Sequence, residues 1–158
     1  MNTKIRNILI PGLALLVLSA CGGGGTDMNS PEYQAYAQRQ AVMDELRDAI
    51  LPLNQMSRDE IPVDETVFLA SVQALAASSE KIMDGWDNET IVAESRATAD
   101  IWANMADFAA KGDDLISASA ALLAATESGG FAAGSPLVEA ARMTCGGCHQ
   151  PYRGPDPD

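Results

Sequence analysis

The chain of 158 residues has little histidine and little cysteine, and this scarcity limits the metal chemistry open to it. Its only histidine is His149, and its three cysteines are Cys21, Cys145 and Cys148. A structural zinc site uses four cysteine or histidine ligands. Three of these four residues belong to one short motif, and beyond it the chain offers only Cys21. The counts therefore argue against a structural zinc site.

Basic residues are also scarce. The sequence contains 10 Lys and Arg against 22 Asp and Glu, and its formal net charge is −12. Nucleic acids and anionic lipid headgroups attract cationic proteins. We therefore expect no nucleic-acid partner and no charge-driven binding to lipid headgroups. An acidic surface keeps a protein soluble, and it can also steer the protein toward a basic partner.

The chain does contain the motif Cys145-Gly146-Gly147-Cys148-His149 near its C-terminus. Cys-x-x-Cys-His is the spacing by which haem c is attached to protein. Residues three and four apart share one face of a helix, so both thiols can bind the two haem vinyl groups while His149 lies beneath the iron. The motif predicts one covalent haem c, held by Cys145 and Cys148, with His149 as the proximal iron ligand. A redox-active disulfide is the alternative for the cysteine pair.

The N-terminus resembles a bacterial lipoprotein signal. Lys4 and Arg6 precede an apolar segment at 8–18, and Leu18-Ser19-Ala20-Cys21 follows in the manner of a lipobox. In such signals the cysteine becomes the lipidated first residue of the mature protein, and several acyl chains anchor it stably. An ordinary signal peptide and an uncleaved anchor are the alternatives.

We therefore divide the chain into a signal peptide at 1–20, a lipidated cysteine with a flexible Gly-rich tether at 21–30, and one domain at 31–158. Without the two basic residues of the signal peptide, eight basic residues stand against 22 acidic ones, a formal charge of −14. The predicted location is periplasmic, with a lipid anchor in a bacterial membrane. Gly22 after the cysteine resembles the pattern of lipoproteins sent to an outer membrane.

The domain shows helical hydrophobic periodicity throughout and lacks the alternating β-branched runs of strands. Ser30 as N-cap and Pro31 at the first position predict a helix from Pro31 to about Leu51. Pro52 is expected to end or bend it. A second helix is predicted over about 64–83, and Gly85 should stop it.

Two neighbouring stripes repeated every seven residues predict the third helix. The first contains Ile101, Phe108, Leu115 and Leu122, and the second contains Trp102, Ala109, Ile116 and Leu123. Glycines at 129, 130 and 134 break the chain, and Ser135 with Pro136 predicts the start of a fourth helix that carries the haem motif. Four amphipathic helices predict an all-α fold, an antiparallel four-helix bundle with the haem on its C-terminal helix.

Three segments of the domain together resemble the class II cytochrome c family, which includes cytochrome c′ and low-spin relatives. They are Arg39-Gln40-Ala41-Val42-Met43, Ile101-Trp102 followed by Phe108, and Cys145 to His149 followed by Arg153. The resemblance implies that Cys145 and Cys148 carry the thioethers, that His149 is the proximal ligand, and that the first helix covers the other haem face.

The resemblance also assigns roles to three further residues. Arg39 matches an arginine near the haem propionates, although a solvated helix charge is an equally good interpretation. Arg153 matches a basic residue of the proximal pocket, but Pro151 should disturb a helix that continues to it. Met43 lies one turn after Arg39, so both can face one cavity.

Met43 decides between two functions. With a single histidine, the second axial position holds methionine, a weaker ligand, an exogenous molecule or nothing. If Met43 binds iron, we expect an electron carrier that serves redox partner proteins in the cell envelope. If Met43 only fills the core, as most methionines on apolar stripes do, we expect a five-coordinate haem that binds a diatomic gas such as nitric oxide.

We find no base, nucleophile or second metal near the motif and expect no enzymatic activity. Some members of the family that the chain resembles dimerise through their first two helices, so a homodimer is possible for this chain as well.

Overall fold

The computed structural model describes residues 27–155, in which helices are the regular elements. These are α1 (Pro31–Ser57), α2 (Glu65–Ser79), α3 (Asp100–Ala103) and α4 (Met105–Tyr152). Gly129 and Gly130 leave helical geometry inside α4, with φ of −147° and 63°. They divide α4 into a first arm, 105–128, and a second arm, 131–152. The predicted signal peptide and Cys21 lie outside the described residues.

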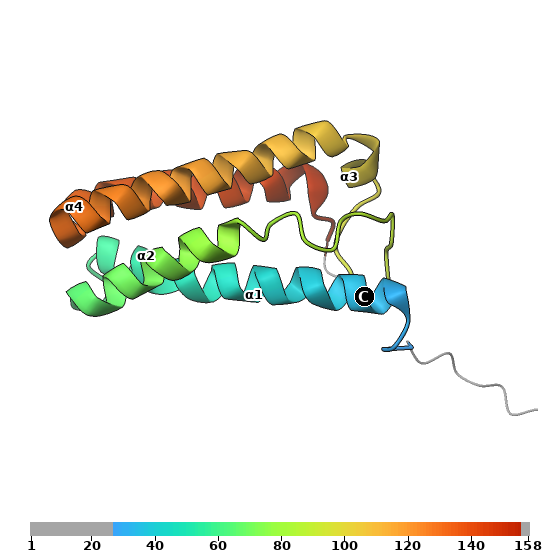
Figure 1. Ribbon diagram of the computed structural model, residues 1–158, viewed down its shortest axis with the longest axis horizontal. Helices are drawn as coiled ribbons and strands as arrows, with labels where there is room; N and C mark the ends of the chain where they lie inside the picture. Colours follow the sequence, from blue (N-terminus) through green and yellow to red (C-terminus); the bar gives the residue numbers. More distant parts are fainter. Residues whose placement is uncertain (1–26, 156–158) are drawn as a thin grey trace, which may run out of the picture.

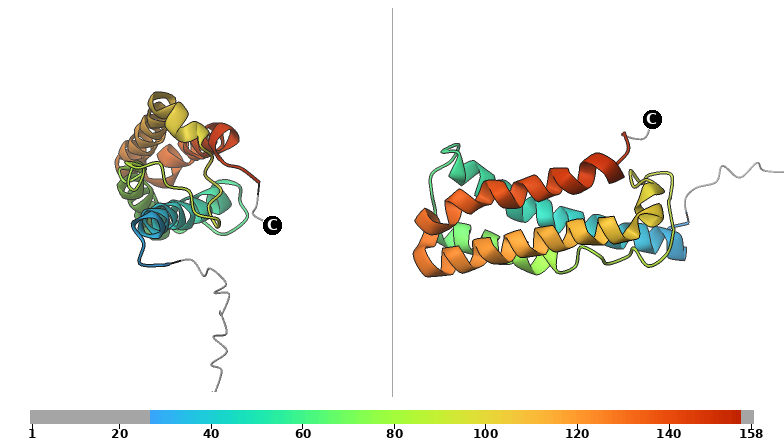
Figure 2. Two further views of the ribbon diagram at one scale, coloured as in Figure 1. Left: turned by 90° about the vertical axis from the view of Figure 1, so that its right-hand side faces the viewer. Right: turned by 90° about the horizontal axis from the view of Figure 1, so that it is seen from above.

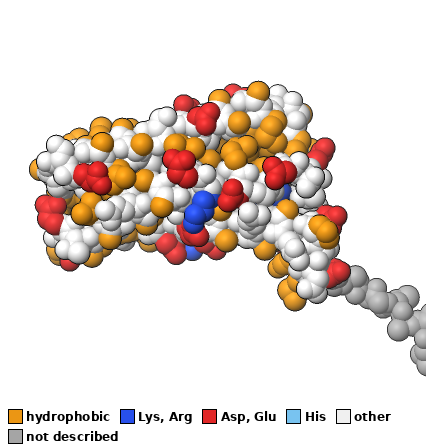
Figure 3. All heavy atoms as spheres, viewed as in Figure 1, with side chains coloured by type: hydrophobic (Ala, Val, Ile, Leu, Met, Phe, Trp, Pro, Cys, Tyr) orange, Lys and Arg blue, Asp and Glu red, His pale blue; other side chains and the backbone are white. Residues whose placement is uncertain are grey.

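The two arms of α4 pack beside α1 and α2, and consecutive segments run in opposite directions (Figures 1 and 2). The fold is therefore the predicted antiparallel four-helix bundle. The described residues contain no strand, only an isolated bridge between Ala97 and Arg153. On the face shown in Figure 3, acidic side chains outnumber basic ones, as the composition requires.

Helix α1 begins as predicted. The Tyr33 amide donates to the Ser30 hydroxyl at 3.2 Å, and Pro31 occupies the first turn. The predicted end near Leu51 is wrong, because the helix continues through Pro52 to Ser57. Beyond Pro52, Leu53 and Met56 are 0% and 1% exposed. The stabilisation from burying these two side chains offsets the cost of the helical hydrogen bond that Pro52 removes.

Helix α2 is capped by Asp64, whose carboxylate accepts from the amides of Thr66 and Val67. It ends at Ser79, four residues before the predicted end, and turns lead from there to Gly85. Gly85 has a φ of 79°, a left-handed conformation that favours glycine. Ile82 is nevertheless buried, so the segment beyond the end of α2 also packs into the core.

The predicted third helix is divided in the structure. Ile101 and Trp102 lie in the short α3, and Asn104 leaves helical geometry before the first arm begins. The second arm begins near Phe131, so the predicted start at Ser135 is wrong. Its first turn receives a cap from α2, because the Phe131 amide donates to Glu65 Oε2 at 2.9 Å.

The main core lies between all four long segments. It includes the buried side chains Leu46, Leu53, Phe68, Val72, Leu75, Leu115, Leu122 and Val138. The arms of α4 approach closely at Gly134, where a Cβ would overlap Thr126 Oγ1 and lie 2.9 Å from Phe68 Cε1. A second cluster of Trp86, Ile101, Phe108 and Tyr152 occupies the end of the bundle that carries the motif.

Candidate haem site

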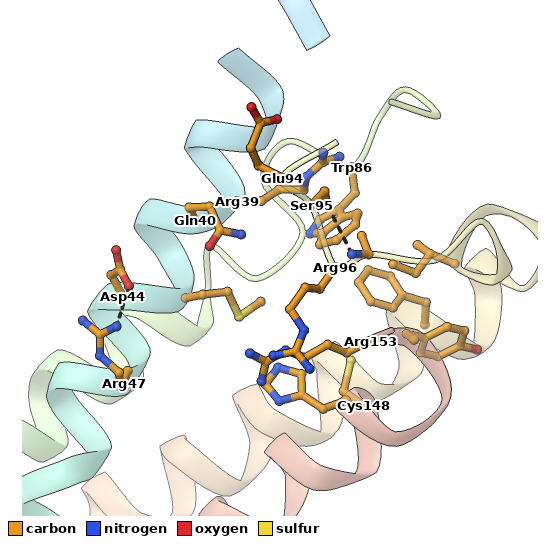
Figure 4. A pocket seen from close by; sticks show the side chains of 16 residues that line it. Arg39, Gln40, Asp44, Arg47, Trp86, Glu94, Ser95, Arg96, Cys148 and Arg153 are labelled. Atoms are coloured by element: carbon orange, nitrogen blue, oxygen red, sulfur yellow. Dashed lines mark hydrogen bonds and ion pairs between the residues drawn. The ribbon is translucent and has the colours of Figure 1, made fainter. Parts of the chain in front are cut away.

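A cavity of about 340 Å³ opens at that end of the bundle. Its walls come mainly from α1, from the loop 84–99 and from the last turns of the second arm, and α3 and the first arm add Ile101 and Phe108 (Figure 4). A smaller cavity of about 70 Å³ shares four lining residues with it, namely Met43, Phe108, Cys148 and His149. The two cavities are thus adjacent and lie between the motif and the opposite wall, which α1 provides.

The haem motif lies in the last turns of the second arm. Cys145 lines the smaller cavity, while Cys148 and His149 line both. Both thiols are free and half-buried, and burial raises the pKa of each. Burial, followed by the charges of Arg153 and Arg96, lowers the pKa of His149. A lowered pKa favours the neutral imidazole, which is the form that binds a metal.

Met43 is half-buried on α1 and lines both cavities together with His149. Two other methionines near this end of the bundle lie outside both cavities. Met105 packs against the second cluster and lines neither cavity, and Met143 is 59% exposed. Met83, which the sequence did not single out, lines the smaller cavity only. Met43 is therefore the one methionine among residues 27–155 that lines both cavities.

Arg39 is only 2% exposed, so it is not a solvated surface charge. Its guanidinium donates to the Gly85 carbonyl at 3.2 Å and to the Thr90 carbonyl at 2.8 Å. It also lies 4.6 Å from the centre of the Trp86 ring. Desolvation lowers its pKa. Within the described part of the chain no acidic side chain pairs with Arg39.

Arg153 reaches the cavity because Pro151 does not interrupt the helix, contrary to the expectation. The second arm continues to Tyr152, and the Arg153 amide donates to the His149 carbonyl at 3.0 Å. Pro151 removes one hydrogen bond in the final turn, where the helix ends one residue later. Arg153 is exposed and lines the same cavity as His149.

Sequence reasoning missed Tyr152 and Arg96. The Tyr152 hydroxyl donates to Asp107 Oδ2 at 2.6 Å, and this bond raises the pKa of Tyr152 to about 12. Its ring packs edge-on against Phe108, at 5.3 Å between centroids. Tyr152 thereby fixes the turn that carries His149, and its spacing of three residues from His149 was a usable signal. Arg96 enters the cavity from a loop and has no such local signal.

The residues present fit a haem c. Two free thiols and a neutral imidazole share one face, and Gly146 and Gly147 have no neighbour within 4 Å of a Cβ position. A buried cation without a carboxylate partner, Arg39, lines the same space and suits an anionic group. Fold and site together define a class of protein, a four-helix-bundle haem protein with its motif on the last helix.

The comparisons identify the family. A sequence model of the family Cytochrome C' matches residues 34–153, and the chain belongs to that family of haem proteins. No curated protein matches the chain. Among solved structures, it is similar to cytochrome c prime from Shewanella frigidimarina, with 25% identity, a TM-score of 0.74, and coverage of 80% of this chain and 98% of that one.

Two further structures share the fold. Cytochrome c' from Rubrivivax gelatinosus has 22% identity and a TM-score of 0.69, over 79% of this chain and 98% of that chain. A nitric oxide complex of a variant of cytochrome c prime from Alcaligenes xylosoxidans has 21% identity and a TM-score of 0.72, over 81% and 98%.

Proposed function

We propose that this haem protein carries electrons in the bacterial cell envelope, with one haem c attached to Cys145 and Cys148 and ligated by His149. The observation that supports it best is that these three side chains and Met43 line one pair of adjacent cavities. A haem bound there supplies one-electron redox chemistry at its iron. The chain holds it, orients the imidazole and excludes water.

Met43 gives the reason to favour electron transfer. Its thioether comes from the wall opposite the motif, from which it could ligate the iron of a haem held by His149. Apolar side chains such as Leu46, Ile82 and Leu115 surround the smaller cavity and restrict water. A filled sixth position leaves no open site for an added molecule, and methionine raises the potential. We propose Met43 as the sixth ligand.

Optical spectra of the ferric and ferrous protein test this assignment. We expect low-spin spectra for the wild type and loss of the low-spin signature in Met43→Ala. Met105→Ala is the matched control, because Met105 lines neither cavity, and it should leave the spectra unchanged. Identical spectra for Met43→Ala and the wild type would show that Met43 is not a ligand.

Binding of nitric oxide is the second candidate, favoured by the shared fold with the nitric oxide complex from Alcaligenes xylosoxidans. It requires that Met43 only packs over an open iron position. The discriminating observation is the ferrous spectrum after addition of nitric oxide or carbon monoxide. A low-spin spectrum that neither gas changes excludes this function, whereas a high-spin spectrum that shifts with the gas excludes the six-coordinate electron carrier.

We further propose that the protein is a lipoprotein anchored through Cys21, that it serves redox partner proteins and that it is not an enzyme. The described chain starts at the cavity-bearing end of the bundle, so a tether there keeps the site near the membrane (Figure 1). Cys21→Ser should move the protein from the membrane fraction to the soluble fraction. Retention of that variant in the membrane fraction would contradict a lipid anchor.

A further inference from the structure

The loop 84–99 is attached by its main chain to the residues that follow the haem motif. The Thr98 amide donates to the Tyr152 carbonyl at 3.1 Å, and the Gly154 amide donates to the Arg96 carbonyl at 2.7 Å. Ala97 and Arg153 form the antiparallel bridge between these two bonds. The loop therefore has a fixed register relative to the turn that carries His149.

This register brings Arg96 to the motif. Its Nε donates to the Gly154 carbonyl at 2.9 Å, which fixes the direction of the side chain. Arg96 and Arg153 then extend into the cavity near Cys148, as Figure 4 shows. Arg96 is half-buried, and it lines this cavity together with Arg153 and His149. Two cations thus act on the same side of the cavity.

The distribution of charge makes this arrangement unusual in the molecule. Eight basic residues follow the predicted signal peptide, and four of them line this one cavity, against two acidic residues, Asp44 and Glu94. The four are Arg39, Arg47, Arg96 and Arg153. Two of these four arginines make other contacts. Arg39 holds the loop through Gly85 and Thr90, and Arg47 pairs at the surface with Asp44 and Asp48. Arg96 and Arg153 line the cavity beside Cys148 and His149.

We propose that Arg96 is a further residue of the haem site and that its charge, together with that of Arg153, raises the reduction potential of the site. Reduction adds one electron, delivered by a redox partner protein, and makes the site one unit more negative. A nearby cation favours this added charge because the cavity wall screens it less than bulk water does. The proposal rests on haem binding at His149.

The test uses the purified haem-loaded full-length protein and a mediated redox titration. Arg96→Gln and Arg96→Met remove the charge with different polarity, and Arg96→Lys keeps it. Arg142→Gln is the control, because Arg142 pairs with Glu139 and lines neither cavity. We expect both neutral variants to lower the midpoint potential, so that at a fixed ambient potential the oxidised-to-reduced ratio rises about fivefold, the effect of one partly screened charge.

Arg96→Lys should keep most of the wild-type potential, and Arg142→Gln should match the wild type. A neutral variant with normal helicity and haem content but the potential of the control would overturn the role of Arg96. Equal losses in Arg96→Lys and Arg96→Gln would overturn a role based on charge. If both neutral variants lost their helical signal, Arg96 would be structural and the proposal wrong. A wild type without covalent haem would instead overturn the proposed function, and this inference with it.

Discussion

Arg39 offers a sharp test of how the cavity is built. It is a buried arginine that joins α1 to the loop 84–99, which forms one cavity wall. Arg39→Gln removes the planar fork that reaches the Gly85 and Thr90 carbonyls together. It also removes the cation above the ring of Trp86. The loop then loses its main attachment to α1.

The expected cost follows from these contacts. Hydrogen bonds from a charged group contribute roughly 1.5–3 kcal/mol each when a buried acceptor would otherwise be left without a partner. The contact with Trp86 adds about 0.5–2 kcal/mol. Removing the charge also has a stabilising effect, because the folded protein no longer bears the cost of desolvating a buried guanidinium. Since glutamine can replace one of the bonds, we expect Arg39→Gln to lower the free energy of unfolding by about 2–4 kcal/mol.

Urea denaturation of the haem-loaded protein, followed by circular dichroism, measures this difference through the transition midpoint at constant slope. Arg47→Gln is the matched control on the same helix, since its side chain is 65% exposed and its ion pairs are at the surface. It should unfold at the wild-type urea concentration. An Arg39→Gln protein with the same midpoint as Arg47→Gln would refute the attachment of the loop by Arg39.

Three further predictions concern packing, ionisation and attachment. Gly134→Ala should destabilise the bundle by about 1–3 kcal/mol in urea denaturation, because its Cβ meets Thr126 and Phe68; wild-type stability would contradict the close approach of the arms. An ultraviolet titration should show the Tyr152 phenol ionising at about 12. Its raised pKa in the folded state means that its contribution to stability is complete below about pH 10 and lost as the pH rises through about 12. In Tyr152→Phe this high-pH loss should disappear, and its persistence would count against the bond to Asp107. Cys148→Ser should lower the fraction of haem that stays bound after denaturation, and unchanged retention would argue against a thioether there.

Local patterns predicted the parts of the fold that depend on burial along a helix. The stripe of Ile101, Phe108, Leu115 and Leu122 is buried throughout, because each of these residues packs inward whether or not the helix is continuous. The ends of helices were predicted less well, since they depend on tertiary contacts. The second arm starts near Phe131 because Glu65, distant in sequence, caps it.

In the site, too, features that depend on local spacing were predicted, and features that depend on tertiary contacts were not. The motif placed both thiols and His149 on one face through spacing alone, and the spacing of Arg39 and Met43 placed both on the cavity wall. The partners of Arg39 were not predictable, because they are carbonyls of a loop without periodicity. Arg96 was missed for the same reason, since only main-chain pairing with residues 152–154 brings it to the cavity.

The most direct measurement of the central claim is the mass of the purified chain after denaturation, combined with a haem assay on the same sample. The account predicts one haem per chain that resists extraction by acidified solvent, with the added mass located on the peptide that contains Cys145 and Cys148. A fully folded chain without haem, or haem that is released on denaturation, would contradict it.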